Sequence, residues 1–272
     1  MKDNRYLELR NKTVTKSNDL IQKSRFSLTL QQQKILLCLI SQITPFDEDF
    51  KLYDFNIVDF CKACGIDYEN GKNYRDLKAA IKEIADKSLW ITIDENEETL
   101  IRWIEKPYIN KNDGIVKIRL DRDMMPFLLQ LKQNFTQYEI IWTLHFKSKY
   151  SIRLYELVKS IHYHELELYK RKYTVDELKK LLDGEKYKEY RDFKRRVLVP
   201  SIAEINQFSD KTVSFDEVKQ GRKVVAIEFT IESKDSIAAL KIRNDIEKEF
   251  GLDQMSLWDD LEGNGKVNPS TD

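Results

Sequence analysis

The sequence has few of the residues that build loops, disulfides and metal sites. Eight glycines, five prolines, three cysteines and three histidines occur in 272 residues. So little glycine and proline argues against a low-complexity chain. An odd number of cysteines without paired spacing argues against a disulfide framework, so a reducing, cytoplasmic setting is expected. No apolar run approaches the roughly 20 residues of a membrane span, and no signal peptide is recognisable, so we expect no membrane partner.

An excess of one charge is also absent. The 46 basic and 46 acidic residues give a formal net charge of zero at pH 7. Affinity for a polyanion would therefore have to come from local basic patches and not from the field of the whole molecule. The length suits two domains that each bury a core, and the hydrophobic content of 41% is that of a globular protein.

The most basic segment is residues 186–196, where six basic residues stand against two acidic ones. On a helix, Lys188, Arg191 and Arg195 would share one face, and Lys194 would lie beside them. A basic face of this kind is typical of a helix that binds a nucleic acid, although a solvated charged face is the common alternative. The candidate DNA-binding residues here are Tyr187, Lys188, Arg191, Lys194, Arg195 and Arg196.

The opposite face of the same helix is apolar. Tyr190, Phe193 and Val197 recur at helical spacing, as a core-facing stripe does. Pro200 cannot donate a hydrogen bond to the carbonyl of Arg196, so a kink or a restart of the helix is expected there. A second stripe of Leu198, Ile202 and Ile205 should anchor the remaining half.

Residues 56–104 follow the element order of a winged helix-turn-helix. Asn56 is a suitable N-cap for a helix that Gly65 ends, and a second helix is expected over residues 72–87. Two strands, over 89–93 and 99–104, would form the wing, and the second helix would be the recognition helix. Its candidate DNA-binding residues are Lys72, Asn73, Arg75, Lys78 and Lys82.

The same order recurs further along the chain. The tripeptide Tyr-Arg-Asp stands at 74–76 and again at 190–192, and Thr174 occupies the N-cap position that Asn56 has in the first copy. Strands over 212–215 and 223–230, joined through Gly221, would form a second wing with Arg222 and Lys223 at its tip. The offset grows from about 116 to about 123 residues, which predicts a second recognition helix about two turns longer than the first.

We therefore expect an α+β protein with two tandem winged helix-turn-helix domains related by an internal repeat. The expected organisation is an N-terminal arm with a short helix (1–24), a first domain with a linking helix (25–135), a second domain (136–250) and a flexible tail (251–272). The first 16 residues should be loosely held. The second domain should be the main DNA-binding one, because acidic residues dilute the first recognition helix.

Three stretches carry a family resemblance: RFSLTLQQQKILLCLISQI at 25–43, FTQYEIIWTLHFKSKYSIRLYELVKS at 135–160, and YRDFKRRVLVPSIAEIN at 190–206. The chain resembles the Rep_3 plasmid replication initiators, the iteron-binding proteins with two winged-helix domains. The resemblance implies that the C-terminal domain reads direct repeats in double-stranded origin DNA. It implies that the N-terminal domain contacts the adjoining backbone and groove, and forms the homodimer that represses the protein's own gene.

The resemblance further implies that the monomer is the active initiator, that the protein helps to open the origin, and that it recruits host replication proteins. Those partners would include the replicative helicase and the initiator ATPase. No cofactor, nuclease activity or ATPase activity is implied, so the protein is expected not to be an enzyme. A winged-helix transcriptional regulator without initiator activity is the first alternative.

The second alternative is a metal-dependent rolling-circle nickase, for which His162-Tyr163-His164 imitates the metal motif. The triplet ends a helical pattern, where two residues apart is 200°, so the imidazoles would point to opposite sides. Cys61 and Cys64 have zinc-type spacing without a second pair, and are expected to pack in the core. No phosphate-binding glycine loop and no catalytic constellation occurs.

The tail carries one further motif. Gln254, Met255, Leu257 and Trp258 resemble the short peptide with which bacterial proteins bind the sliding clamp. The alternative is that Leu257 and Trp258 pack on the chain's own domain, because an apolar pair in so polar a segment needs burial in one place or the other.

Overall fold

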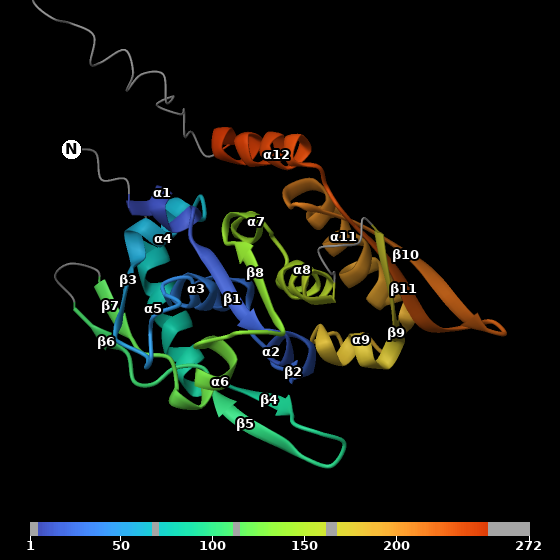
Figure 1. Cartoon of the computed structure of the whole chain (residues 1–272), viewed down its shortest axis with the longest axis horizontal. Helices are drawn as coiled ribbons and strands as arrows, with labels where there is room; N and C mark the ends of the chain where they lie inside the picture. Colours follow the sequence, from blue (N-terminus) through green and yellow to red (C-terminus); the bar gives the residue numbers. More distant parts are fainter. Residues whose placement is uncertain (1–4, 67–70, 111–114, 162–167, 250–272) are drawn as a thin grey trace, which may run out of the picture.

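Two winged helix-turn-helix units make up most of the fold in the computed structural model, which describes residues 5–66, 71–110, 115–161 and 168–249. Figure 1 shows the first unit in blue to green and the second in yellow to orange. A hairpin projects from each unit, and the C-terminal helix lies at the top of the view, away from the lower hairpin. The expected α+β architecture with an internal repeat is therefore confirmed.

The first unit is built around three helices and a short wing. Its helices are α3 (Leu30–Ile40), α4 (Ile57–Ala63) and α5 (Gly71–Asp86). Its wing pairs β4 (Ser88–Thr92) with β5 (Glu98–Arg102), and β2 (Ser24–Arg25) adds a third strand beside β4. A separate sheet has the order β3 (Tyr53–Asn56), β7 (Ile115–Ile118), β6 (Tyr108–Ile109). The short η1 (Arg122–Met124) follows β7 along the chain.

The second unit repeats this order with a longer wing. Helix α8 (Lys149–Ile161) precedes β9 (Leu168–Thr174) and α9 (Val175–Leu181). The recognition helix runs through α10 (Tyr190–Phe193), the π-helical segment η2 (Lys194–Leu198) and α11 (Val199–Phe208). Strands β10 (Lys211–Gln220) and β11 (Lys223–Ser233) form the wing, in a sheet of order β10-β11-β9.

Local capping explains why the corresponding helices start where they do. The side chain of Asn56 accepts hydrogen bonds from the backbone N–H groups of Val58 and Asp59, which begins α4. Thr174 and Glu177 form a capping box at the start of α9. Gly65 has a φ of 64°, the left-handed conformation that ends α4 with little strain. These caps occupy equivalent places in the two copies, as the sequence repeat predicts.

The two recognition helices differ less in length than the sequence predicts. Helix α5 has 16 residues, and the helix from Tyr190 to Phe208 has 19, so the difference is below one turn rather than two. The error arises at the N-terminal end. The second helix has six more residues after the tripeptide tyrosine than α5 has, but α5 begins three residues before Tyr74, whereas Tyr190 is the first residue of α10.

The N-terminal arm and the linking segment also differ from expectation. Residues expected to be loosely held form α1 (Arg5–Arg10) and β1 (Thr13–Ser17), and the short helix α2 (Asn18–Lys23) follows them. In place of one linking helix the chain forms α6 (Met125–Leu128), β8 (Phe135–Glu139) and α7 (Ile141–Leu144). Strand β8 pairs antiparallel with β1, which buries Val14 and explains why the arm is ordered.

A buried ionic cluster joins this strand pair to the second unit. Lys16 of β1 contacts Glu156 of α8 at 2.6 Å, and Tyr138 of β8 donates a hydrogen bond to the same carboxylate oxygen at 2.6 Å. Arg153 lies 3.5 Å from the other oxygen and donates to the carbonyl of Leu181 at the end of α9. The attraction of Lys16 and Arg153 keeps the pKa of Glu156 below its usual value despite burial.

Helix α12 (Ser236–Glu249) ends the described chain and contacts both units. Ile246 is buried against the main core, whereas Ile237 is 83% exposed. Arg243 donates hydrogen bonds to Glu139 of β8 and to Asn11 of the arm. Helix α12 therefore fixes the second unit against the N-terminal arm. Within the described ranges, no helix combines the length and apolar character that a membrane span requires.

Candidate nucleic-acid interface

The second recognition helix has one apolar and one basic face, as predicted. Phe193, Val197, Leu198 and Ile205 are fully buried, and Tyr190 is half-buried. On the other side Arg191, Arg195 and Arg196 are exposed. Arg195 donates a hydrogen bond to Asp192 at 2.9 Å. Because this ion pair is exposed to water, its interaction free energy is small. Arg191 and Arg196 make no hydrogen bond or ion pair with any part of the chain that the structure describes.

The helix changes its hydrogen-bond pattern in the basic segment. The N–H of Val199 donates to the carbonyl of Lys194, five residues earlier, and Pro200 follows near the start of α11. Because Pro200 has no N–H, the π turn lets the helix continue where a regular turn would lack a donor. The expected kink or restart near Pro200 takes the form of a π segment through which the helix continues to Phe208. Arg195 and Arg196 both remain exposed, whereas the next two residues are both buried.

Two of the predicted contact residues lie before the helix. Glu189 is the N-cap, so Tyr187 and Lys188 belong to the preceding loop and not to the helical stripe. Tyr187 is half-buried and packs its ring against Tyr150 with centroids 6.3 Å apart. Lys188 is exposed, and its carbonyl accepts a hydrogen bond from Lys179 at 2.7 Å. Tyr187 therefore packs the loop before the recognition helix against α8, while Lys188 adds a cation just before the start of the recognition helix.

Lys194 is tied to the wing. Its Nζ lies 2.8 Å from Oε1 of Glu217 on β10, and the hydroxyl of Tyr190 donates to the same oxygen at 2.9 Å. These hydrogen bonds, that from Lys194 first, lower the pKa of Glu217. Lys194 also lies over the ring of Phe215 at 5.6 Å. The sequence stripe places Lys194 among the DNA-facing cations, and the structure gives it a carboxylate partner on the neighbouring hairpin.

The wing tip carries the two predicted cations. Gly221 has a φ of 62° in the turn between β10 and β11, and Arg222 and Lys223 follow it, both exposed. The hairpin projects beyond the helices at the right of Figure 1. Sequence reasoning missed three further exposed cations, Lys170, Arg171 and Lys172, on the edge strand β9 of the same sheet. Their signal was three consecutive basic residues between two tyrosines.

The first recognition helix presents a smaller basic surface. Arg75, Lys78 and Lys82 are exposed along one side of α5 and form no ion pair with other described residues. Together with apolar residues that include Ile81, Pro107 and Ile109, and with the acidic Asp86, they line a groove of about 490 Å³. Lys72 and Asn73 fall in the first turn of α5, and their side chains lie outside the described residues. The helix also carries exposed acids, including Asp76 and Glu83.

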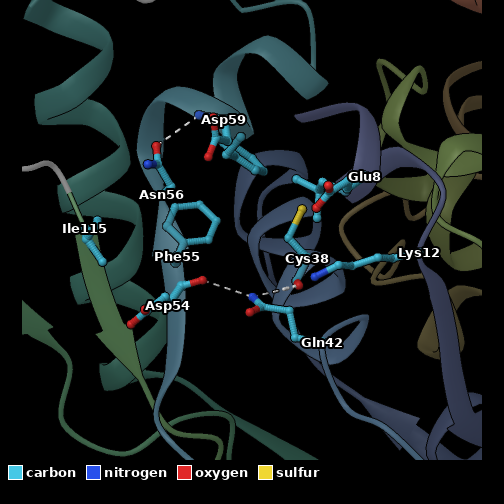
Figure 2. A pocket seen from close by; sticks show the side chains of 11 residues that line it. Glu8, Lys12, Cys38, Gln42, Asp54, Phe55, Asn56, Asp59 and Ile115 are labelled. Carbon is cyan, nitrogen blue, oxygen red and sulfur yellow. Dashed lines mark hydrogen bonds between the residues drawn. The ribbon is translucent and has the colours of Figure 1, made fainter. Parts of the chain in front are cut away.

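A pocket of about 210 Å³ lies behind the first helix-turn-helix, between α1, α3 and the β3–α4 junction. Figure 2 shows Asn56 bonded to the backbone of Asp59, and Gln42 placed between the carbonyls of Cys38 and Asp54. Its walls mix both charges with apolar groups. The hydrogen bonds of Gln42 connect the end of α3 to β3, and that of Asn56 holds the start of α4. The residues that line the pocket therefore support the fold of the helix-turn-helix.

The cysteines have the environment of packing residues. Cys38 and Cys61 are buried, and burial raises the pKa of Cys61 to about 12 and that of Cys64 to about 11. Among the residues with a defined placement, no three His, Cys, Asp or Glu side chains are positioned to hold a metal ion. The motif His162-Tyr163-His164 and the tail residues Gln254 to Trp258 lie outside the described residues.

Comparison with known families gives two adjoining matches. Residues 13–159 match the sequence model described as initiator replication protein, WH1. Residues 174–231 match the one described as initiator Rep protein, WH2. The first matched segment contains the first unit and most of helix α8, and the second contains α9, the recognition helix and most of the wing of the second unit.

Comparison with individual proteins agrees with these family matches. A replication initiation protein of Escherichia coli is 26% identical over 229 residues, which are 80% of this chain and 69% of that protein. The PI protein of Escherichia coli is 31% identical over 154 residues, 50% of this chain and 48% of that protein. A crystal structure of Pi initiator protein in complex with iteron DNA superposes with a TM-score of 0.68 at 22% identity, covering 84% of this chain and 99% of that one. At that identity the likeness shows the shared fold.

Proposed function

This chain belongs to the family of initiator replication proteins with two winged-helix domains, and from that premise we propose that it binds repeated sites in origin DNA and initiates plasmid replication. A structure of similar fold is that of an initiator in complex with iteron DNA. In this proposal the protein acts by binding duplex DNA, and supplies no nuclease or ATPase chemistry of its own.

The observation that carries the proposal is the surface made by the second recognition helix and its wing. Arg191, Arg195 and Arg196 are exposed on a helix whose opposite face is anchored in the core. A helix fits the major groove, where arginine can form two hydrogen bonds to the edge of guanine. Arg222 and Lys223 are exposed at the tip of the long hairpin, and in this proposal they contact the backbone beyond the groove.

The first domain has a secondary part in this proposal. Its recognition helix presents Arg75, Lys78 and Lys82, while neighbouring acidic side chains reduce the local positive charge. We assign it contacts to the adjoining backbone and groove, which position the protein more than they select a sequence. In its dimeric form the protein would repress its own gene, and as a monomer it would initiate replication.

Opening of the origin would be followed by recruitment of the host helicase, the initiator ATPase and the sliding clamp. The clamp proposal rests on the sequence of Gln254, Met255, Leu257 and Trp258 alone. Such a peptide can place two large apolar side chains in a groove while the amide fixes its register. Titration calorimetry of a peptide covering residues 252–261 with host clamp should give a Kd near the micromolar range, about −8 kcal/mol. Absence of binding at hundreds of micromolar would refute this part.

The DNA-binding part is tested by alanine substitution on the helix. We expect Arg191→Ala to weaken binding to the cognate repeat by about 1–3 kcal/mol and to relax base preference, if it contacts guanine. Lys241→Ala, which removes an exposed cation from α12, is the matched control and should leave affinity unchanged. Fluorescence anisotropy with cognate and scrambled duplexes measures both. If Arg191→Ala and Arg195→Ala each bind like the wild type, this helix is not the recognition element.

A further inference from the structure

The second recognition helix and its wing are connected by one carboxylate. Oε1 of Glu217 accepts hydrogen bonds from Lys194, at 2.8 Å, and from Tyr190, at 2.9 Å, both one helical turn apart on the recognition helix. The carboxylate side chain is 22% exposed, and Lys219 approaches its other oxygen at 3.8 Å. An acidic residue on a DNA-binding surface repels phosphate, so its presence there needs a reason.

The neighbouring contacts indicate what this carboxylate does. Lys194 is held on a second side by the ring of Phe215, 5.6 Å from its Nζ. If Lys194 turned to a phosphate, Glu217 would lose its main counter-charge while facing the anionic backbone. The shared hydrogen bond with Tyr190 would not replace that charge. Lys194 is therefore better placed to neutralise Glu217 than to contact DNA.

The position of Glu217 on the wing adds a geometric consequence. The register of β10 against β11 shifts between Val218 and Lys219, one residue after Glu217, because β11 has an extra residue there, Val225. A bulge bends its strand and redirects the residues beyond it. The hairpin is thus joined to the recognition helix at Glu217, and the bulge in β11 lies between that contact and the tip, so the contact and the bulge together set the angle between the helix and the tip residues Arg222 and Lys223.

We propose that Glu217 is a positioning residue of the DNA-binding surface, which holds the wing at a fixed angle to the recognition helix and withholds Lys194 from the phosphate backbone. The proposal rests on the proposed function and deepens it: Arg191 and Arg196 contact phosphates or base edges, and Lys194 does not. Six cations in the basic segment thereby yield fewer DNA contacts than the sequence indicates.

The salt dependence of binding separates this role from a merely structural one. Each phosphate contact contributes about 0.9 to the slope of log K against log salt concentration. The DNA for this measurement is the duplex that the protein protects in a footprint of the DNA flanking its own gene. With this duplex, Lys194→Ala should have the same slope as the wild type. Glu217→Gln should steepen it by about 0.9, because Lys194 is released toward the backbone. The double variant Glu217→Gln with Lys194→Ala should return it to the wild-type value.

Lys223→Ala, which removes a wing cation assigned to the DNA backbone, provides the internal control and should reduce the magnitude of the slope by about 0.9. The proposal is overturned if the magnitude of the slope decreases by about 0.9 for Lys194→Ala alone, or if the slope does not change for Glu217→Gln. If Arg191→Ala and Arg195→Ala each bind the cognate duplex like the wild type, the proposed function of the helix fails instead, so the two failures are distinguishable.

The positioning of the wing is read out separately. In Glu217→Ala, hydroxyl-radical protection at the flank contacted by the wing should weaken at least fivefold more than protection at the segment contacted by the helix. Equal loss at both, or no loss at the flank, contradicts the role assigned to Glu217. Circular dichroism of each variant checks that the fold is intact.

Discussion

At the scale of single residues, the structure separates cations that face solvent from cations that have a partner. Arg191 and Arg196 are exposed without an ion pair to a described residue, Arg195 has a weak one, and Lys194 has a close one with Glu217. A helical wheel treats these four residues alike. The carboxylate that distinguishes them lies on another element, and its contact follows from the packing of the hairpin on the helix.

A second residue-scale feature is the buried imidazole of His145, 9% exposed after α7. Burial, and the nearby positive charges of Arg10 and Lys34, lower its pKa to about 3. The ordinary value is about 6.5, so as pH falls the unfolded chain takes up a proton before the folded one. The contribution of His145 to stability is thus complete above about pH 6.5, and is lost progressively as the pH falls toward about 3.

We predict that this group accounts for about 1–2 kcal/mol of the stability lost between pH 7 and pH 5. Urea unfolding of the wild type and of His145→Gln at both pH values measures it, because the glutamine cannot take up the proton. The wild type should lose more than the variant by that amount. Equal losses would show that His145 is protonated alike in both states.

At the scale of elements, a close approach fixes the second recognition helix. A Cβ added at Gly184 would lie 2.6 Å from Cε2 of Phe193, which is fully buried at the start of that helix. Gly184→Ala should force the ring to move and destabilise the protein by about 1–3 kcal/mol. DNA affinity should fall as well, because the helix shifts. Thermal unfolding and anisotropy report the two effects.

The matched control is the double variant Gly184→Ala with Phe193→Leu, in which a smaller side chain leaves room for the added methyl. Relative to Phe193→Leu alone, the alanine should then cost clearly less than it does in the wild type. An undiminished cost would show that the contact with Phe193 is not the cause.

The elements that sequence predicts well here are those with local signals. Asn56 and Thr174 mark helix starts, Gly65 marks a helix end, and the apolar stripe of the recognition helix becomes buried as expected. The prediction of one linking helix was wrong, because residues 126–146 are rich in apolar residues that suit either a helix or a strand. What decides for β8 is its pairing with β1, more than 100 residues earlier. Periodicity within a segment carries no information on such a distant partner.

The candidate site shows the same division. The sequence identifies the basic helix, its exposed arginines and the cations at the wing tip, since charge and spacing are local. It does not show that Tyr187 packs on Tyr150, that Lys194 meets Glu217, or that β9 adds cations to the wing sheet. Each of these depends on which element lies beside which, and thus on the tertiary fold.

At the scale of the whole molecule, the two winged-helix units are joined through the N-terminal arm. Lys16 on β1 and Glu156 on α8 form a buried pair at 2.6 Å, with Tyr138 and Arg153 completing its hydrogen bonds. Helix α12 adds a second connection through Arg243. The arm therefore serves as part of the packing between the units, and a fragment that lacks it would leave Glu156 buried with fewer partners.

We predict that Lys16→Met lowers the free energy of unfolding by about 3–5 kcal/mol, because it leaves a buried carboxylate without its closest cation. Lys23→Met removes a solvent-exposed partner of Asp19 from the same arm and should cost less than about 1 kcal/mol. Urea denaturation of both variants gives the comparison. Similar small losses for the two would mean that the buried pair does not hold the units together.

The central claim is that the second recognition helix directs this protein to repeated DNA sites, and footprinting on the DNA flanking its own gene tests it most directly. The account predicts several protected segments with one regular spacing. It predicts that the protection is lost when Arg191→Ala and Arg195→Ala are combined, and kept in Lys241→Ala. Absence of any repeated protection, or an unchanged footprint in the double arginine variant, would contradict it.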